Sequence, residues 1–445
     1  MTNETTESTK TTKGRHPLIW VPSLYFAQGL PFAVVVILSS VMYKKMGVSN
    51  EEVAYWPNFL GLAWAFKPLW SPFLELAGSK KKVVVAFQII CGACLVACAS
   101  VLQLSNYFVL SLVLFGLVAY SSATHDIAAD GSYIANLSKQ QQAMYSGWLG
   151  AFWNGGKLFV QGGLIVLAGH LEKTIGIAGA WSTVLLILGA LLVALGFYHT
   201  WAMPTPAVVK RAELTARVVA ATTKDVIIEF FKKPGIWWAI CFIILFRAGE
   251  GQVQTMGRLF LLDPVSAGGL GLTTEQLGIA YGTVATLAFI VGSILGGYFA
   301  AWLGLKRSMF IMILAMNVPN LTFLYLNVFH PTDMVTISTV LSVEMLGYGA
   351  GFPALMLYIM QVVAPGKYST AHYALGTGIM QLGFILFSMM SGKIEAWLGY
   401  HDFFIWCVLS AIPVLVMSLI VPIPSKEEIL ARKTPEASDA EAKPA

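Results

Sequence analysis

The sequence is dominated by long apolar runs with short polar breaks, and this pattern limits the fold more than any other feature. A helix needs about 20 apolar residues to cross the hydrocarbon core of a bilayer. Only 11% of the 445 residues are charged, whereas a soluble domain has roughly 25%. We predict an all-α integral membrane protein with twelve transmembrane helices, over residues 18–42, 53–76, 83–103, 106–137, 143–169, 178–201, 235–261, 275–303, 307–328, 335–363, 370–396 and 402–422.

One long connection, residues 202–234, divides these runs into two groups of six. The groups look duplicated, because similar basic turns, Gly78-Ser79-Lys80-Lys81 and Gly304-Leu305-Lys306-Arg307, follow the second and eighth runs. Two six-helix halves joined by a long loop resemble the major facilitator fold, with pseudo-symmetric 6+6 halves. We expect five segments: a disordered tail (1–17), an N-terminal bundle (18–201), a linker with an amphipathic helix over 210–232 (202–234), a C-terminal bundle (235–422) and a second disordered tail (423–445).

Lysine and arginine gather on one side of the predicted membrane, and such residues concentrate in cytoplasmic loops. The N-terminal tail has no apolar stretch of the kind found in a cleavable signal. We therefore expect both termini in the cytoplasm. The inner side would hold the basic residues at 80–82, 139, 210, 211, 217, 224, 232, 233, 306, 307 and 367, and the outer side those at 44, 45, 173 and 393.

Nothing in the sequence indicates a cofactor, a metal site or a nucleic-acid partner. The net charge of +5 comes from basic residues in loops. Cys91, Cys94 and Cys98 share one helix face, but no histidine lies near them, and small residues commonly form helix contacts in membranes. We expect no disulfide framework, since all five cysteines lie in apolar runs.

Seven charged side chains fall well inside the predicted helices. A charge at such depth is costly, so it normally faces a bundle interior or a water-filled path and marks function. Two of them, Asp126 and Asp130, share a helix face with Ser122 and Tyr133, because residues spaced by about four align on a helix. The seven are Lys67, Asp126, Asp130, Lys157, Arg247, Glu250 and Glu344.

Structural and functional roles compete at each of these positions. Lys67 could neutralise Asp126 or Asp130 as a fixed pair, or it could act in substrate binding or coupling. Arg247 and Glu250 are three residues apart and could pair on one helix. Both interpretations stay open for each group.

Three further positions carry similar alternatives. Lys157, beside Trp153 and Asn154, could be a counter-ion or a substrate contact. Glu344 could be a proton site or a structural acid, in a helix that the three glycines of residues 347–351 are expected to make flexible. Gln28 lies just before Pro31, which should kink the first helix, and could be a ligand there.

Three stretches together resemble the AmpG branch of the major facilitator superfamily, the muropeptide permeases and the peptide/acetyl-CoA transporter group. They are Gln28-Gly29-Leu30-Pro31-Phe32-Ala33, Phe66-Lys67-Pro68-Leu69-Trp70-Ser71-Pro72-Phe73-Leu74-Glu75 and Ala123-Thr124-His125-Asp126-Ile127-Ala128-Ala129-Asp130. The resemblance is clear over residues 20–160 and only topological in the second half. It implies a monomeric carrier in the bacterial inner membrane that imports anhydromuropeptides with protons, and a cavity lined by helices 1, 4, 7 and 10.

The resemblance also implies roles for individual residues. Two carboxylates one turn apart cannot both be ionised cheaply in a low-dielectric site, so the helix-4 acids are expected to carry the proton and to reset against the helix-2 lysine. We predict proton coupling by Asp126, Asp130, Lys67 and Glu344; substrate binding by Gln28, His125, Trp153, Asn154, Lys157, Arg247 and Glu250; and gating by Glu75, Lys80, Lys306 and Arg307.

The sequence departs from the family pattern at three positions, and other functions compete with muropeptide import. His125 stands where the family commonly has glutamine, Ser132 where tryptophan is frequent, and Glu75 where aspartate is common. Siderophore importers of the RhtX/FptX kind belong to the same branch, so a ferric siderophore is the alternative substrate. A membrane-embedded transferase using His125 and Asp126, or a sensor on a transporter fold, is a lesser alternative; we expect no enzyme.

Overall fold

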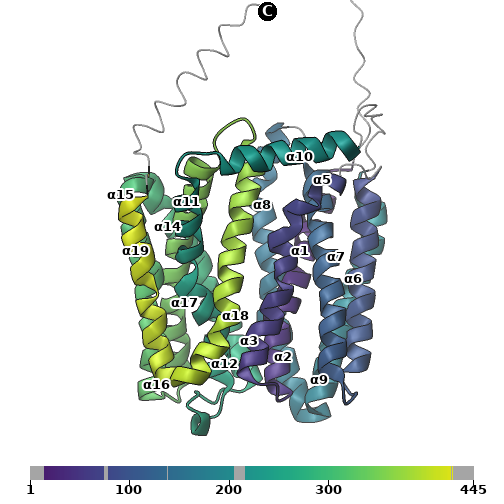
Figure 1. Cartoon of the computed structure of the whole chain (residues 1–445). Helices are drawn as coiled ribbons and strands as arrows, with labels where there is room; N and C mark the ends of the chain where they lie inside the picture. The colour runs from purple at the N-terminus through teal and green to yellow at the C-terminus, as the bar shows by residue number, and fades with distance from the viewer. Residues whose placement is uncertain (1–14, 75–78, 138, 205–215, 422, 424–445) are drawn as a thin grey trace, which may run out of the picture.

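The computed structural model describes residues 15–74, 79–137, 139–204, 216–421 and 423, and all regular secondary structure in these ranges is helical (Figure 1). The N-terminal half contains α1 (Pro17–Phe32), η1 (Ala33–Leu38), α2 (Ser39–Lys45), α3 (Asn50–Leu60), α4 (Leu62–Phe66), η2 (Lys67–Leu69), α5 (Ser71–Leu74), α6 (Lys80–Val101), α7 (Tyr107–Asn136), α8 (Lys139–Leu158), η3 (Phe159–Leu164) and α9 (Ile165–Ala202).

The linker helix α10 (Ala216–Phe231) precedes the second half. That half contains α11 (Ile236–Phe246), α12 (Ala248–Leu262), η4 (Val265–Ala267), α13 (Thr274–Leu277), η5 (Gly278–Ala285), α14 (Thr286–Leu303), α15 (Leu305–Asn317), η6 (Val318–Asn320), α16 (Leu321–Phe329), α17 (Met334–Tyr358), η7 (Ile359–Val363), α18 (Ser369–Leu409) and α19 (Ala411–Ile420).

Within the described residues, nine helical stretches are long and apolar enough to cross a membrane. The chain reverses direction at Gly176 (φ 75°) within the stretch Leu149–Ala202, and at Gly399 (φ 73°) within the stretch Ala371–Ile420. Each of these two stretches therefore supplies two spans. The second predicted span is divided into α3, α4, η2 and α5, which are too short to be counted singly. With these adjustments the structure agrees with the twelve predicted helices.

The first transmembrane helix changes its winding directly after Pro31. Proline has no N–H to donate within a helix, and its ring crowds the preceding turn. The α-helix ends at Phe32, and the chain continues as the π-helical segment η1 before α2 begins. The helix therefore changes to wider winding one residue after this proline, and the predicted kink stays a prediction.

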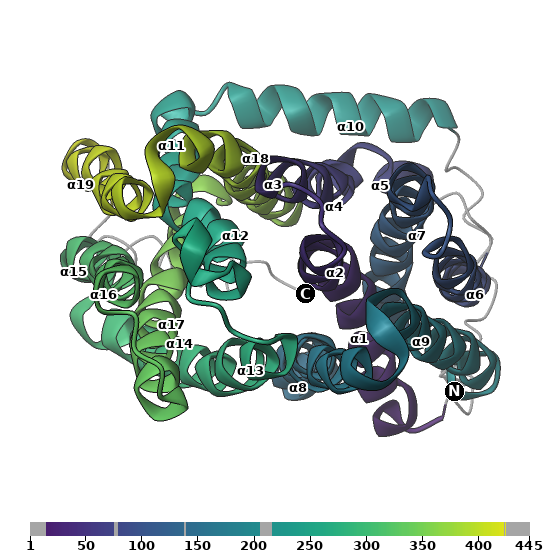
Figure 2. The same cartoon turned by 90° about the horizontal axis from the view of Figure 1, so that it is seen from below.

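One end of the molecule, which we call the α10 end, gathers the start of α1, the start of α6, the end of α9 and α10 itself (Figure 1). Lys81 Nζ donates to the Met203 carbonyl at 2.7 Å, and Lys233 Nζ donates to the Val363 carbonyl at 2.5 Å. Figure 2 shows α10 lying along one side of the bundle and reaching across both halves. The predicted amphipathic helix over 210–232 is thus observed from Ala216, and residues 210–215 lie outside the described part.

The two halves share one apolar core at the opposite end, which we call the far end. That core joins Leu30 and Trp181 of the first half to Phe260 and Phe404 of the second. Near the α10 end the halves have separate cores, one around Trp20 and the other built from α11, α15 and α17. The two halves therefore share an apolar core at the far end and have separate apolar cores near the α10 end, where α10 still spans both halves; α18 also contacts α4 and η2 of the first half.

Glycines let helices α14 and α17 pack at backbone contact. A Cβ atom on Gly292 would lie 2.1 Å from the Leu346 carbonyl oxygen, and one on Gly296 would lie 2.1 Å from the Ala350 carbonyl oxygen. From the other side, Gly349 faces the Phe289 carbonyl. The glycines of residues 347–351 thus serve close packing in a continuous α17, and the expectation that they make this helix flexible stays a prediction.

This packing makes a prediction about stability. We expect Gly296→Ala to destabilise the protein by about 1–3 kcal/mol, the usual cost of overpacking, because the clash is with backbone and cannot be relieved by a side-chain rotation. Gly297→Ala is the matched control, since a Cβ there has no atom within 4 Å. Thermal unfolding in detergent should show a lower melting temperature for the first variant only; equal melting temperatures would contradict the packing argument.

Candidate functional site

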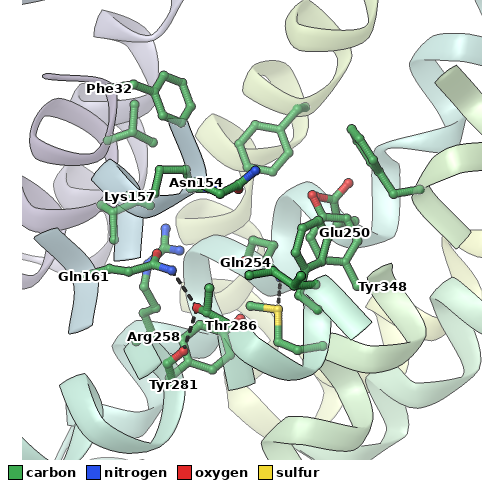
Figure 3. A pocket seen from close by; sticks show the side chains of 18 of the residues that line it. Phe32, Asn154, Lys157, Gln161, Glu250, Gln254, Arg258, Tyr281, Thr286 and Tyr348 are labelled. Carbon is green, nitrogen blue, oxygen red and sulfur yellow. Dashed lines mark hydrogen bonds between the residues drawn. The ribbon is translucent and has the colours of Figure 1, made fainter. Parts of the chain in front are cut away.

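A cavity of about 500 Å³ lies between the two halves, within the 300–1,000 Å³ range typical of ligand sites. Its walls come mainly from α1, η1, α8 and η3 in the first half and from α12, η5, α14, α17 and α18 in the second (Figure 3). The lining is mostly apolar and aromatic, with Phe32, Phe352 and Phe384 among its members. Polar and charged side chains are set among these apolar groups, and we expect them to decide which ligand the cavity accepts.

Arg247 and Glu250 form a buried ion pair in this cavity, which is one of the two alternatives that their spacing left open. The Arg247 Nε atom lies 2.9 Å from Glu250 Oε2, and both side chains are about 95% buried. Arg247 stands at the break between α11 and α12, and its guanidinium also lies 4.7 Å from the Phe384 ring centroid. The pair leaves little net charge on this side of the cavity.

Lys157 faces the cavity from α8, and Trp153 and Asn154 also line it, as predicted. The Lys157 ammonium lies 5.1 Å from the centroid of the Trp153 ring, a favourable cation–π distance. A helical turn further on, the Gln161 amide donates to Thr286 Oγ1 of the other half at 2.6 Å. This wall of the cavity therefore combines an ammonium group with an amide that bridges the halves.

Arg258 is a cavity residue that the sequence analysis missed. It lies four residues before the end of α12, it is 94% buried, and it lines the cavity. It lies within the predicted run 235–261 and was not counted among the charged residues inside the helices. The spacing of Arg247, Glu250, Gln254 and Arg258 places all four on one helix face, and this spacing was the signal that could have identified it.

The helix-4 acids form a separate buried cluster inside the N-terminal half. Tyr25 of α1 donates its hydroxyl to Asp130 Oδ1 at 2.9 Å, and Lys67 Nζ lies 3.7 Å from Asp126 Oδ2. His125 Nδ1 lies 3.7 Å from Asp126 Oδ1. The predicted pairing of the helix-2 lysine with a helix-4 acid is therefore observed, and the partner is Asp126.

The expectation that helix 4 lines the central cavity is wrong for the cavity described above, because α7 contributes no residue to its wall. The physical reason is that the two acids point toward Tyr25 of α1 and Lys67 of η2, so their face of α7 is covered by neighbouring helices. Gln28 and His125, predicted to contact substrate, are also absent from the wall and are buried within this half.

The sequence matches a known protein family over most of its length. The family described as Major Facilitator Superfamily matches residues 23–388. The chain belongs to the Major Facilitator Superfamily. The anhydromuropeptide permease of Escherichia coli (strain K12) is 25% identical over 410 residues, covering 89% of this chain and 78% of that protein. The AmpG 4 protein of Rickettsia conorii is 22% identical over 409 residues, covering 88% and 93%.

Solved structures of major facilitator proteins have the same fold. The nucleoside transporter NupG superposes with a TM-score of 0.67 at 17% identity, covering 90% of this chain and 98% of that one. A bacterial homologue of the human lysosomal transporter Spinster, in an inward-facing occupied conformation, gives 0.68 at 14% identity, covering 92% and 97%. At these identities the likeness concerns the fold alone.

In this major facilitator protein the remaining predicted residues lie away from the cavity wall. Glu344 is 98% buried in α17, and its Oε2 atom has no hydrogen-bond partner in the described chain. Lys80 begins α6, where its side chain lies against Gly131 of α7. Lys306 and Arg307 are exposed at the start of α15, and Glu75 lies outside the described residues.

Polar contacts close the far end between the halves of this major facilitator protein. Asp263, directly after α12, forms an ion pair with Lys44 and accepts hydrogen bonds from Asn50 Nδ2 at 3.0 Å and the Tyr400 hydroxyl at 2.6 Å. Lys393 Nζ lies 3.5 Å from Glu51 Oε1. Asp263 is thus the centre of a network that sequence analysis did not find, since its members are far apart in the chain.

Proposed function

We propose that this protein is a proton-coupled importer of an anionic, moderately large solute, with anhydromuropeptides as the first candidate. The observation that carries the proposal is the cavity between the halves, whose wall holds Lys157, Arg247 and Arg258 against a single acid, Glu250. Such an excess of cationic side chains favours an anionic ligand. The relationship to an anhydromuropeptide permease supplies the substrate class.

The buried acid cluster supports the proton half of this proposal. Asp126 is 97% buried, and its Oδ1 atom has no hydrogen-bond partner in the described chain, although Lys67 lies near its other oxygen. An intramembrane acid of this kind is a functional candidate by default. Because the acids lie in the N-terminal half and not in the cavity wall, we propose that proton and substrate occupy separate sites that communicate through α1, which contacts both.

The basic residues at the α10 end and the separate apolar cores of the two halves there support import toward that end. The α10 end carries Lys81, Lys224 and Lys233, in keeping with the cytoplasmic enrichment of basic residues. With that orientation, in a bacterial inner membrane, we propose that this conformation is inward-facing, because the halves share an apolar core at the far end and have separate apolar cores near the α10 end. We propose that the far-end network around Asp263 holds this state and that its rupture starts the return to the outward-facing one.

The gating proposal has its own test. Asp263→Ala removes one ion pair and two hydrogen bonds, worth about 2 kcal/mol or more together, and should move the conformational equilibrium roughly 30-fold toward opening of the far end. Disulfide formation between cysteines at Glu51 and Lys393, in a background without Cys94 and Cys241, would report the change. We expect slower cross-linking than in the parent and in the control Lys45→Ala; an unchanged rate would refute the role of Asp263.

A binding screen tests the substrate class most simply. Purified protein in detergent would be titrated with an anhydromuropeptide and with a ferric siderophore, and heat release or thermal stabilisation would be measured. The proposal predicts saturable binding of the anhydromuropeptide at concentrations at which the siderophore gives none. The reverse order would replace muropeptide import with siderophore import, and it would leave the family assignment intact.

A further inference from the structure

Two cationic side chains of the cavity have no ion-pair partner within the described residues, and they come from different halves of the protein. Lys157 lies on α8 and Arg258 on α12, and neither has a carboxylate within 4.0 Å in the described part of the chain. Arg258 is 94% buried, and its Nε atom has no hydrogen-bond partner there. A buried guanidinium without a counter-ion is costly, so its presence at the cavity wall needs a reason.

The two cations act on each other. Arg258 and Lys157 repel each other electrostatically, while Glu250 attracts Lys157. Figure 3 shows Lys157, Gln161 and Arg258 gathered in one corner of the cavity, with the Arg258 guanidinium directed toward the other two. The corner therefore concentrates positive charge, which an anion placed there would neutralise.

Nearby groups leave this corner positive. Glu250 is engaged by Arg247, 2.9 Å away on the same helix face. Glu344 and Tyr281 are the main electrostatic neighbours of Arg258, but Glu344 is not part of the cavity wall and lies beyond ion-pair distance. Gln161 donates one of its two amide N–H groups to Thr286, and that bond holds η3 against the other half.

We propose that Lys157 and Arg258 form an anion subsite that binds a carboxylate or phosphate group of the transported solute between the two halves. The planar guanidinium offers two parallel N–H donors to such a group, and the ammonium adds a point charge from the opposite side. Since one residue belongs to each half, the bound anion connects the halves across the cavity. The inference deepens the proposed function and rests on it for the identity of the solute.

The test compares two probes that differ in whether their carboxyl groups are ionised carboxylates or neutral amides. An anhydromuropeptide with free carboxylates and the same compound with every carboxyl amidated would be titrated into the full-length protein in detergent. We expect the wild type to bind the carboxylate form at least ten-fold more tightly. Arg258→Gln and Lys157→Gln should each remove most of this preference, and the double variant should lose little more, because both cations hold one anion.

Controls separate binding from folding. Lys393→Gln removes an exposed cation at the far end and should keep the full preference for the carboxylate form. Without ligand, Arg258→Gln should unfold at the same temperature as the wild type or higher, because it relieves a repulsion between buried cations. Full preference in Arg258→Gln, or a lowered melting temperature together with loss of both probes, would overturn the subsite.

Failure of the proposed substrate can be told apart from failure of the subsite. If neither muropeptide binds, the substrate assignment is wrong, and inorganic phosphate then serves as the probe. The subsite predicts that millimolar phosphate raises the melting temperature of the wild type but not of Arg258→Gln. Equal stabilisation of both proteins, or of neither, would reject the subsite on its own.

Discussion

Proteoliposomes carrying the Asp126→Asn/Asp130→Asn variant are expected to take up solute only to equal concentrations on both sides, whatever pH gradient is imposed. In the proposed mechanism the two acids carry the coupled proton, and neither asparagine can bind it. A gradient of two pH units is worth about 2.7 kcal/mol per proton, so one coupled proton supports about 100-fold accumulation by the wild type. The measurement is the steady-state ratio of labelled anhydromuropeptide inside and outside.

The substitution should leave the carrier folded and able to bind. The Lys67 side chain is 34% exposed, so loss of its partner does not strand a fully buried charge. Binding of the muropeptide to the purified variant, and exchange of solute without a gradient, are therefore expected to persist. Accumulation by the variant at the wild-type ratio would show that these acids do not couple transport to protons.

The Arg247→Gln variant is expected to be destabilised by about 3–5 kcal/mol, the cost of breaking a buried ion pair by removal of one partner. The reason is that Glu250 is 97% buried beside it and would lose its only ion-pair partner in the described chain. Thermal or denaturant unfolding of the purified protein measures the effect.

Removal of both charges provides the matched control. Arg247→Gln combined with Glu250→Gln leaves no unpaired buried charge from this pair, so most of the lost stability should return. Transport is expected to stay impaired in the double variant, because the cavity wall has lost two of its polar groups. A double variant as unstable as the single one would mean that the pair is not the energetic unit proposed here.

Local patterns in the sequence predicted much of the molecule. Apolar runs fix transmembrane helices because a bilayer leaves no alternative partner for backbone groups, and all twelve runs are accounted for. Helix geometry allowed the pairing of Arg247 with Glu250, and the structure selects it. Lys67 was correctly matched to the helix-4 acids by charge balance, although only the structure selects Asp126.

Other features depend on how helices rotate and meet, which one sequence does not determine. The acids of α7 were expected in the cavity, yet Tyr25 of α1 and Lys67 cover them. The network of Asp263 joins Lys44, Asn50 and Tyr400, which are distant in the chain. Arg258 was not among the predicted site residues, and its place in the cavity wall depends on how α12 is rotated against the other half.

Uptake under an imposed pH gradient tests the central claim most directly. Wild-type protein would be reconstituted into liposomes with an alkaline interior, and labelled anhydromuropeptide would be added outside. Proton-coupled import predicts accumulation well above the outside concentration, abolished by a protonophore. Uptake that reaches only equal concentrations, with or without the protonophore, would contradict proton coupling.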